Sequence, residues 1–174
     1  MFIKAYTKYL STRLLNKSSQ STEGEELMLQ KLKVECGHNT VNKLASMFND
    51  IALSKDLMTE FKQSPLSTFI RDELKIEFTA EVLTNGHWPE QGNPACSLPQ
   101  EMKVITTKFE QFYKNKYQNR NISWLYNNGS LELRPVYITS KPYQFVVSCY
   151  QAVVLLQYNR GKAEYTFQEL RDAT

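Results

Sequence analysis

The chain has 174 residues, of which 41% are hydrophobic and 22% charged, and it contains 10 Tyr and 9 Phe. A disordered chain lacks this much aromatic and aliphatic surface to bury, so the composition excludes disorder and predicts one domain or two small subdomains. The formal net charge is +3, from 21 basic and 18 acidic residues spread along the chain. A net charge this small creates no strong electrostatic field, so the charge gives no reason to expect nucleic acid or an anionic membrane as a partner.

The cysteines and the hydropathy of the chain indicate the cellular compartment in which the protein resides. Cys36, Cys96 and Cys149 are odd in number, widely spaced and form no C-x-x-C motif, which argues against a secreted disulfide framework. The segment MFIKAYTKYL lacks the apolar run of a signal peptide, and no window reaches the roughly 18 apolar residues of a membrane span. We expect a protein of the cytoplasm and/or nucleus that does not enter membranes.

Three helices are predicted within residues 1–63. The first has apolar residues at spacings of three and four, namely Ile3, Tyr6, Leu10 and Leu14. Thr22-x-x-Glu25 is interpreted as a capping box that opens the second helix, which Gly37 closes. The third helix has one apolar stripe, formed by Val41, Leu44, Ala45, Phe48, Ile51 and Ala52. Ser54 is predicted to cap a further turn.

A change of period marks the main boundary, at residues 62–73. The segment SPLSTF interrupts the helical pattern, and apolar and polar residues then alternate over 74–83. This alternation predicts a half-buried strand. Asn85-Gly86 and the prolines that follow predict a loop, after which apolar residues over 102–116 predict a helix that Pro99 starts.

The remaining elements are short. Asn128-Gly129 between two apolar runs predicts a β-hairpin over 122–136, because both residues accept the positive φ of a tight turn. Lys141-Pro142 predicts another turn, and YQFVVSC predicts a strand running into the helix QAVVLLQYN. Thr166-x-x-Glu169 is a second capping box, whose helix is about two turns long before the chain stops.

Catalytic or metal-binding chemistry has few candidates. A Cys–His dyad at Cys36-x-His38, or a zinc site that adds His87 and Cys96, would use the soft side chains available. Neither spacing is diagnostic of such a site, and a small buried cysteine at a helix end is ordinary. We therefore predict no catalytic residue, no metal and no cofactor.

The basic and aromatic segment 108–124 leaves nucleic-acid binding open. Its cations and rings are Lys108, Lys114, Lys116 and Arg120, interleaved with Phe109, Phe112, Tyr113 and Tyr117. Such a face could stack on bases and bind phosphates. Phe109, Phe112 and Lys116, however, share the helix face that must pack on the sheet, so packing is the favoured interpretation.

The loop LTNGHWPEQGNPACSLP, residues 83–99, contains Trp88 and three prolines. No ionisable pair accompanies this Trp. We interpret the loop as structural, with the indole ring buried on the helical layer.

Several motifs, taken in order, resemble the cullin homology region. The most specific are Lys43-Leu44-x-x-Met47-Phe48-x-Asp50-Ile51-x-x-Ser54-Lys55, the turn Gly86-x-Trp88-Pro89, and the segment from Gln151 to Asn159. Others are KLKVECG, LPQEM, FEQFYKNKYQNRNISWLYNNGSLEL and YTFQELRDAT. The resemblance covers essentially the whole chain.

The resemblance implies an α+β fold with a helical-bundle remnant at 1–63, a small α/β domain with a mixed sheet at 74–164, and the truncated start of a winged-helix subdomain at 165–174. Cullins also carry long N-terminal repeats that bind an adaptor and a C-terminal lysine that accepts a ubiquitin-like modifier. Neither lies in these 174 residues. His38-Asn39-Thr40 also departs from related sequences, which tend to have an aromatic residue. The chain resembles a truncated gene product or an excised fragment.

Cullins are scaffolds of multi-subunit ubiquitin ligases, so the resemblance implies a non-enzymatic binding module. A RING-box protein, which is a zinc-binding RING subunit, would add its N-terminal strand to the sheet by β-augmentation and bring in a ubiquitin-conjugating enzyme. The sheet would consist of the strand 74–83 and the hairpin 122–136. The residues expected to bind this partner are Glu77, Phe78, Thr79, Ala80, Glu81, Val82, Leu83, Trp124 and Leu131.

Two alternatives stay open. A nucleic-acid binder that uses 108–124 would lose affinity steeply with salt. A degenerate cullin-like product without binding activity would unfold in a broad, uncooperative transition.

Overall fold

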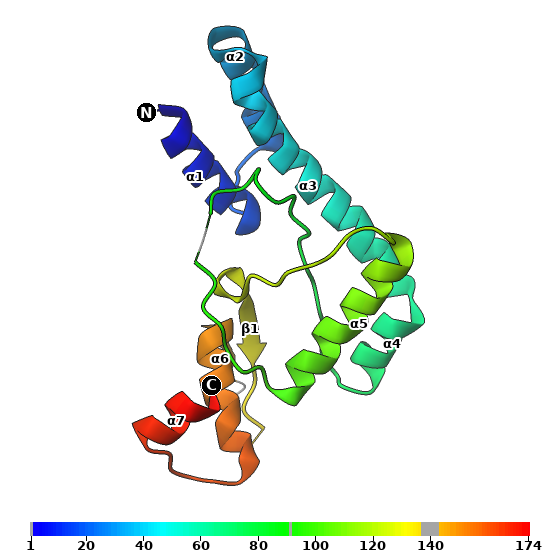
Figure 1. Ribbon diagram of the computed structural model, residues 1–174, viewed down its shortest axis with the longest axis vertical. Helices are drawn as coiled ribbons and strands as arrows, with labels where there is room; N and C mark the ends of the chain where they lie inside the picture. Colours follow the sequence, from blue (N-terminus) through cyan, green and yellow to red (C-terminus); the bar gives the residue numbers. More distant parts are fainter. Residues whose placement is uncertain (1, 91, 137–142) are drawn as a thin grey trace. The chain divides into compact units, whose positions relative to one another are not determined.

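A computed structural model describes residues 2–90, 92–136 and 143–174. The chain forms two compact units, Met1–Glu90 (unit 1) and Gln91–Thr174 (unit 2). Figure 1 colours the ribbon along the sequence, from blue at the N-terminus to red at the C-terminus. Unit 1 consists of helices and an extended segment, and unit 2 combines helices with a two-stranded antiparallel sheet. The predicted α+β class is confirmed. The subdomain boundaries implied by the resemblance remain predictions.

The helices of unit 1, in its described part, are α1 (Phe2–Leu15), α2 (Thr22–Cys36), α3 (His38–Gln63) and α4 (Pro65–Asp72). The apolar residues of the first three meet in one cluster, as the periodicity predicted for the first and third helices requires. Its members are Leu10, Leu14, Leu29, Leu32, Val41, Leu44 and Met47. Burial of such side chains stabilises a fold by roughly 1.5–3 kcal/mol each, so this cluster is a major source of stability in unit 1.

The N-terminus of α2 corrects the predicted capping box. Ser21, and not Thr22, is the N-cap residue, and its hydroxyl accepts a hydrogen bond from Gly24 N at 3.0 Å. The Glu25 carboxylate binds Arg13 of α1 instead of returning to the cap. A charged guanidinium on the neighbouring helix competes better for a carboxylate than a neutral backbone amide does.

The helix α3 corrects the predicted cap at Ser54, because it runs without a break to Gln63 and holds Ser54 in its interior. Ser64 then ends α3 and also caps α4, where its hydroxyl accepts a hydrogen bond from Ser67 N at 3.3 Å. The helix α4 is not predicted by the sequence pattern. The segment SPLSTF contains the start of a helix as well as the end of one. Pro65 occupies the first turn of α4, where its missing N–H costs nothing.

Residues 76–83 form an extended segment, here named the strap. The prediction of a strand over 74–83 is wrong, because the strap pairs with no other strand in the described part of the chain. The alternation is present over 76–80, where Ile76, Phe78 and Ala80 are half-buried and Glu77 and Thr79 are exposed, whereas residues 80–83 are all half-buried. Lys75 has φ 55°, in the left-handed region, so no regular strand continues through it.

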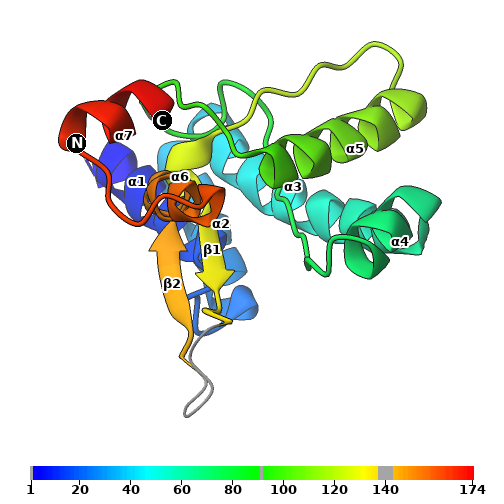
Figure 2. The ribbon, with the colours of Figure 1, turned by 90° about the horizontal axis from the view of Figure 1, so that it is seen from below.

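Unit 2 begins with α5 (Gln100–Lys116) and continues with the 3₁₀ turn η1 (Tyr126–Asn128) and the strands β1 (Ser130–Leu133) and β2 (Phe145–Ser148). It ends with α6 (Cys149–Gln157), the 3₁₀ turn η2 (Tyr158–Arg160) and α7 (Phe167–Ala173). The two strands lie side by side (Figure 2), and in their register Leu131 is opposite Val147. The predicted passage from strand to helix and the Thr166–Glu169 capping box are confirmed.

The predicted hairpin over 122–136 is wrong. Asn128 ends η1, Gly129 precedes β1, and the partner of β1 is β2. Gly129 has φ −84°, so a positive φ is not the reason why a glycine stands at this position. A Cβ at this position would instead collide with Cys149 Sγ, so glycine allows the close approach of α6. The turn predicted at Lys141-Pro142 lies outside the described residues.

The helix α5 begins after Pro99, as predicted. Its buried stripe is Ile105, Phe109 and Tyr113, which lie four residues apart. Lys116, predicted to share the packing face, is exposed, because the stripe follows the four-residue spacing through Tyr113.

Candidate partner-binding surface

The residues predicted to bind a partner fall in both units. Glu77 to Leu83 make up nearly all of the strap in unit 1, whereas Trp124 precedes η1 and Leu131 lies in β1 of unit 2. The geometry of each group is set by contacts within its own unit.

Ser54 fastens the strap to α3. Its hydroxyl accepts a hydrogen bond from Val82 N at 2.7 Å and donates one to Val82 O at 3.1 Å. Ser54 is 1% exposed, so water does not compete for these bonds. One side chain therefore satisfies both backbone groups of Val82, as a neighbouring strand would otherwise do.

Asp50, one helical turn before Ser54, binds the chain just beyond the strap. Its carboxylate accepts hydrogen bonds from Thr84 N and Thr84 Oγ1, each at 2.8 Å, and from Trp88 Nε1 at 2.7 Å. Asp50 is 5% exposed, and three donors to a buried carboxylate are the arrangement that its burial requires. The Trp88 ring also packs against the core cluster, so the prediction of a structural Trp88 loop is confirmed.

The strap makes two further contacts within unit 1. The rings of Phe61 and Phe78 meet edge to face, with centroids 6.0 Å apart. Lys17 Nζ lies 3.1 Å from Glu81 Oε1, and because the lysine side chain is 71% exposed this pair contributes little. The contacts move from Phe61 through Ser54 to Asp50 along α3 while the residue numbers of their partners in the extended chain rise. The strap and α3 therefore run antiparallel.

The hydrogen-bonding roles of Asp50 and Ser54 are not among the features predicted above from the sequence. A signal for them is present, because both polar residues interrupt the apolar stripe of α3 at spacings of three and four from Met47, Leu57 and Met58. Polar residues at buried helical positions indicate a hydrogen-bond network.

The sheet of unit 2 presents two further strand edges. Leu131 and Leu133 are half-buried on the face that also carries Val147 and Phe145, their partners in the register. Val146, on the opposite face, is 71% exposed. A two-stranded sheet leaves one edge of each strand without a strand partner in the described part of unit 2.

Trp124 is held by its own unit. Its Nε1 donates to Glu110 Oε1 at 2.7 Å, and its ring meets Phe109 edge to face at 5.8 Å. Asn93 holds the same segment, since its Nδ2 donates to Trp124 O at 2.7 Å and its Oδ1 accepts from Tyr126 N at 3.1 Å. Trp124 therefore has a structural role in shaping the approach to β1.

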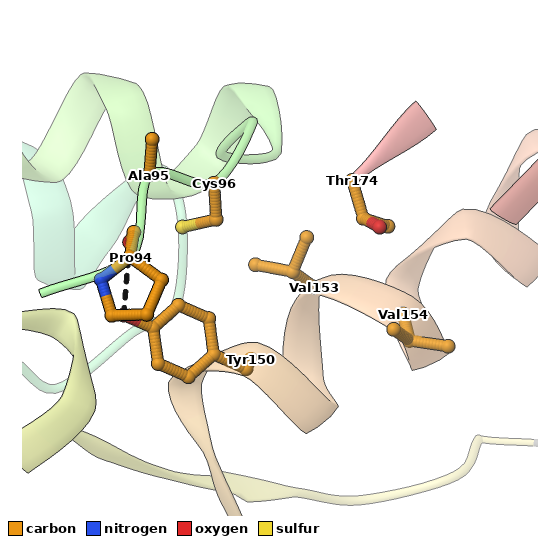
Figure 3. A pocket seen from close by; sticks show the side chains of 7 residues that line it. All are labelled: Pro94, Ala95, Cys96, Tyr150, Val153, Val154 and Thr174. Atoms are coloured by element: carbon orange, nitrogen blue, oxygen red, sulfur yellow. Dashed lines mark hydrogen bonds between the residues drawn. The ribbon is translucent and has the colours of Figure 1, made fainter. Parts of the chain in front are cut away.

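A shallow pocket of about 230 Å³ lies in unit 2, beside α6 (Figure 3). Its lining is mostly apolar, and the Tyr150 hydroxyl on its rim donates to Pro94 O at 3.0 Å. Burial raises the pKa of the Cys96 thiol in this pocket and of the buried Cys149 thiol, so neither is an activated thiolate. The pocket offers no acid–base pair for catalysis.

Among residues 2–90, 92–136 and 143–174, no group of three or more His, Cys, Asp or Glu side chains is arranged to hold a metal ion. The same part of the chain contains no helix long and apolar enough to cross a membrane.

The aromatic segment of α5 is engaged internally. The Tyr117 ring lies 4.9 Å from the Tyr113 ring, and Arg120 and Lys116 approach it at 4.9 and 5.6 Å. A ring already covered by cations of its own chain is a poor platform for stacking a base.

Comparisons with known proteins agree with this architecture. The family model described as the cullin alpha+beta domain matches residues 82–174, and the one described as the cullin alpha solenoid domain matches residues 1–58. The first match begins within the strap and contains the whole of unit 2.

Individual relatives match along the whole chain. It is 37% identical to Cullin-3 of Dictyostelium discoideum over 177 residues and 37% identical to human Cullin-4A over 174 residues, with 100% of this chain and 22% of each relative covered. Cullin-1 of Schizosaccharomyces pombe is also 37% identical, over 177 residues, with the same coverage. The chain spans 22% of the length of these relatives. It belongs to the cullin family.

Proposed function

We propose that the chain is a non-catalytic part of a ubiquitin-ligase scaffold, and that it holds a RING-box protein by β-strand pairing. Family membership supports the scaffold role. A scaffold acts by positioning its partners, which is consistent with the apolar, shallow character of the pocket beside α6. Through the RING-box protein, a ubiquitin-conjugating enzyme would join the complex indirectly.

The observation that carries this proposal is the state of the strap. It is extended, largely half-buried, fastened to α3 by Ser54, and without a strand partner in the described ranges. An extended segment that is already held in place has lost most of its conformational entropy before a partner arrives. A second chain can therefore add a strand there and gain backbone hydrogen bonds at little ordering cost.

The sheet of unit 2 supports the same mode of binding. Each of its strands has an edge of the kind that accepts another strand, and Leu131 lies in β1 among half-buried apolar side chains. Such side chains would provide specificity beside the backbone hydrogen bonds.

The test is co-expression of the 174-residue chain with a RING-box protein, followed by size-exclusion chromatography and thermal melting. We expect a one-to-one complex and a higher Tm than for the chain alone, because a ligand that binds only the folded state stabilises it. The matched control is the same RING-box protein without its N-terminal segment, which should no longer co-elute.

Failure has two distinguishable forms. If the chain melts cooperatively but never co-elutes with the intact partner, the proposed function is wrong. If the chain shows only a broad transition, the alternative of a product that folds poorly is favoured. We also propose residence in the cytoplasm and/or nucleus, which a fluorescent fusion would test.

A further inference from the structure

We propose that Ser54 and Asp50 are positioning residues that decide which backbone groups of the strap a partner strand can use. They turn the even-numbered residues toward the helices of unit 1 and leave Glu77, Thr79 and Glu81 as the pairing edge. This inference rests on the proposed function, since it assigns the contacts within that interaction.

The first step is the direction of the even-numbered amides. Val82 N donates to Ser54 at 2.7 Å and Thr84 N donates to Asp50 at 2.8 Å, both on α3. At the other end of the strap, Ile76 N donates to Ile70 O of α4 at 3.4 Å. All three N–H groups therefore point toward the helices of the same unit.

The second step is the geometry of an extended chain. The N–H and C=O groups of one residue point to one edge of a strand, and those of the next residue point to the other edge. If Ile76, Val82 and Thr84 face the helices, then Glu77, Thr79 and Glu81 face away from them. In the described part of the chain, the backbone groups of these three residues form no hydrogen bond.

The third step is the match of spacing between strap and helix. Two residues of extended chain, from Val82 to Thr84, span about 6.6 Å at roughly 3.3 Å per residue. One turn of α3, from Ser54 back to Asp50, spans about 6 Å at roughly 1.5 Å per residue. The two side chains thus reach successive even-numbered amides, and a shift of the strap by one residue would break both sets of hydrogen bonds.

The choice of the outward edge also determines which side chains of the strap would lie beside a partner strand. A strand paired with the outward edge would lie beside Glu77 and Thr79, whose side chains are exposed, and Glu81, which is bound to Lys17. Cross-strand neighbours of opposite charge are favourable, so a basic residue opposite Glu77 suits this edge.

Residue-resolved amide hydrogen exchange, measured by NMR on the full chain with and without a RING-box protein, tests the assignment. In the free chain, the amides of Val82 and Thr84 should exchange slowly and those of Thr79 and Glu81 quickly. In the complex, Thr79 and Glu81 should each gain at least about tenfold protection, whereas Val82 and Thr84 should change little.

The positioning role is tested with Ser54→Ala, and Ser46→Ala on the same helix is the matched control. Binding is measured at a temperature at which circular dichroism shows both variants fully folded. Ser54→Ala should weaken the affinity for the RING-box protein about tenfold and speed exchange at Val82, while Ser46→Ala should change neither.

The outcomes separate the two proposals. A complex in which only even-numbered amides gain protection, or in which the strap gains none, overturns the assigned edge and leaves the proposed function intact. An unchanged affinity for the folded Ser54→Ala variant overturns the positioning role. The absence of any complex overturns the proposed function and this inference with it.

Discussion

Arg13 of α1 and Glu25 of α2 form a two-point ion pair, with Nε 2.6 Å from Oε1 and Nη2 2.9 Å from Oε2. The Tyr6 hydroxyl donates to the same carboxylate at 3.1 Å, and the Arg13 guanidinium lies 5.6 Å from the Tyr6 ring centre. Only 12% of the Glu25 side chain is exposed. These three residues join two helices that share the core cluster of unit 1.

Glu25→Gln is expected to destabilise the protein by about 1–2 kcal/mol, because a neutral amide cannot accept both guanidinium hydrogen bonds and leaves Arg13 without its counter-charge. Urea denaturation followed by circular dichroism gives the free energy of unfolding. Glu26→Gln, at an exposed neighbouring position, is the control and should stay within about 0.5 kcal/mol of the parent. Equal losses in both variants would contradict the role of the ion pair.

Acid should weaken the parent protein more than Glu25→Gln. The hydrogen bonds from Arg13 hold the pKa of Glu25 below its ordinary value of 4.5. An acid whose pKa is lower in the folded state stabilises the fold above its unfolded-state pKa, and this contribution is lost as pH falls through the folded-state pKa. The free energy of unfolding of the parent should therefore fall toward that of Glu25→Gln as the pH drops below about 4.5. Parallel pH profiles for the two proteins would rule this coupling out.

Trp88→Phe should destabilise the protein by about 1–3 kcal/mol, because the buried Asp50 carboxylate loses one of its donors while most of the ring packing remains. Combining Trp88→Phe with Asp50→Ala, which leaves no acceptor for Trp88 Nε1, tests the cause by a double-mutant cycle of unfolding free energies. We expect the double variant to lose less than the sum of the single losses, since both changes remove the same hydrogen bond. Strict additivity would show that the two side chains act independently.

Gly129→Ala should cost about 1–3 kcal/mol, because the new methyl group would collide with the Cys149 thiol. Gly92→Ala, where a Cβ would meet nothing within 4 Å, is the matched control and should be neutral or slightly stabilising. Cys149→Ala removes the sulfur and should recover part of the loss in the Gly129→Ala background. Thermal melting checks all of these variants, and a neutral Gly129→Ala would disprove the close approach.

Local patterns predicted the helices well, because caps and apolar stripes act within a few residues. The spacing of Leu10 and Leu14 indicated α1, Gly37 marked the end of α2, and Thr166 with Glu169 marked the start of α7. Each of these signals concerns hydrogen bonds or contacts between residues close in sequence.

The strap shows why the rest could not be predicted. Alternating burial indicates an extended chain with two different faces, but it does not reveal what satisfies the backbone. Here the acceptors are Ser54 and Asp50, which lie 28 and 34 residues away from Val82 and Thr84. The sequence identified the strap as a candidate site, and only the structure distinguishes its inner and outer backbone edges.

The pairing of β1 has a similar origin. Asn128-Gly129 is a strong local turn signal, yet Gly129 is required by the approach of Cys149 from a later helix. A contact of this kind, between residues 20 positions apart, leaves no local periodicity in the sequence.

The outward edge of the strap also bears on self-association. An unpaired extended segment is a hazard, because it can add the same segment of a second copy and start aggregation. If two copies paired antiparallel about Thr79, Glu77 of each would lie opposite Glu81 of the other, and like charges directly opposite destabilise such a pair. The two glutamates would thus act as gatekeepers, which disfavour this self-pairing while leaving the edge open to a strand of different charge.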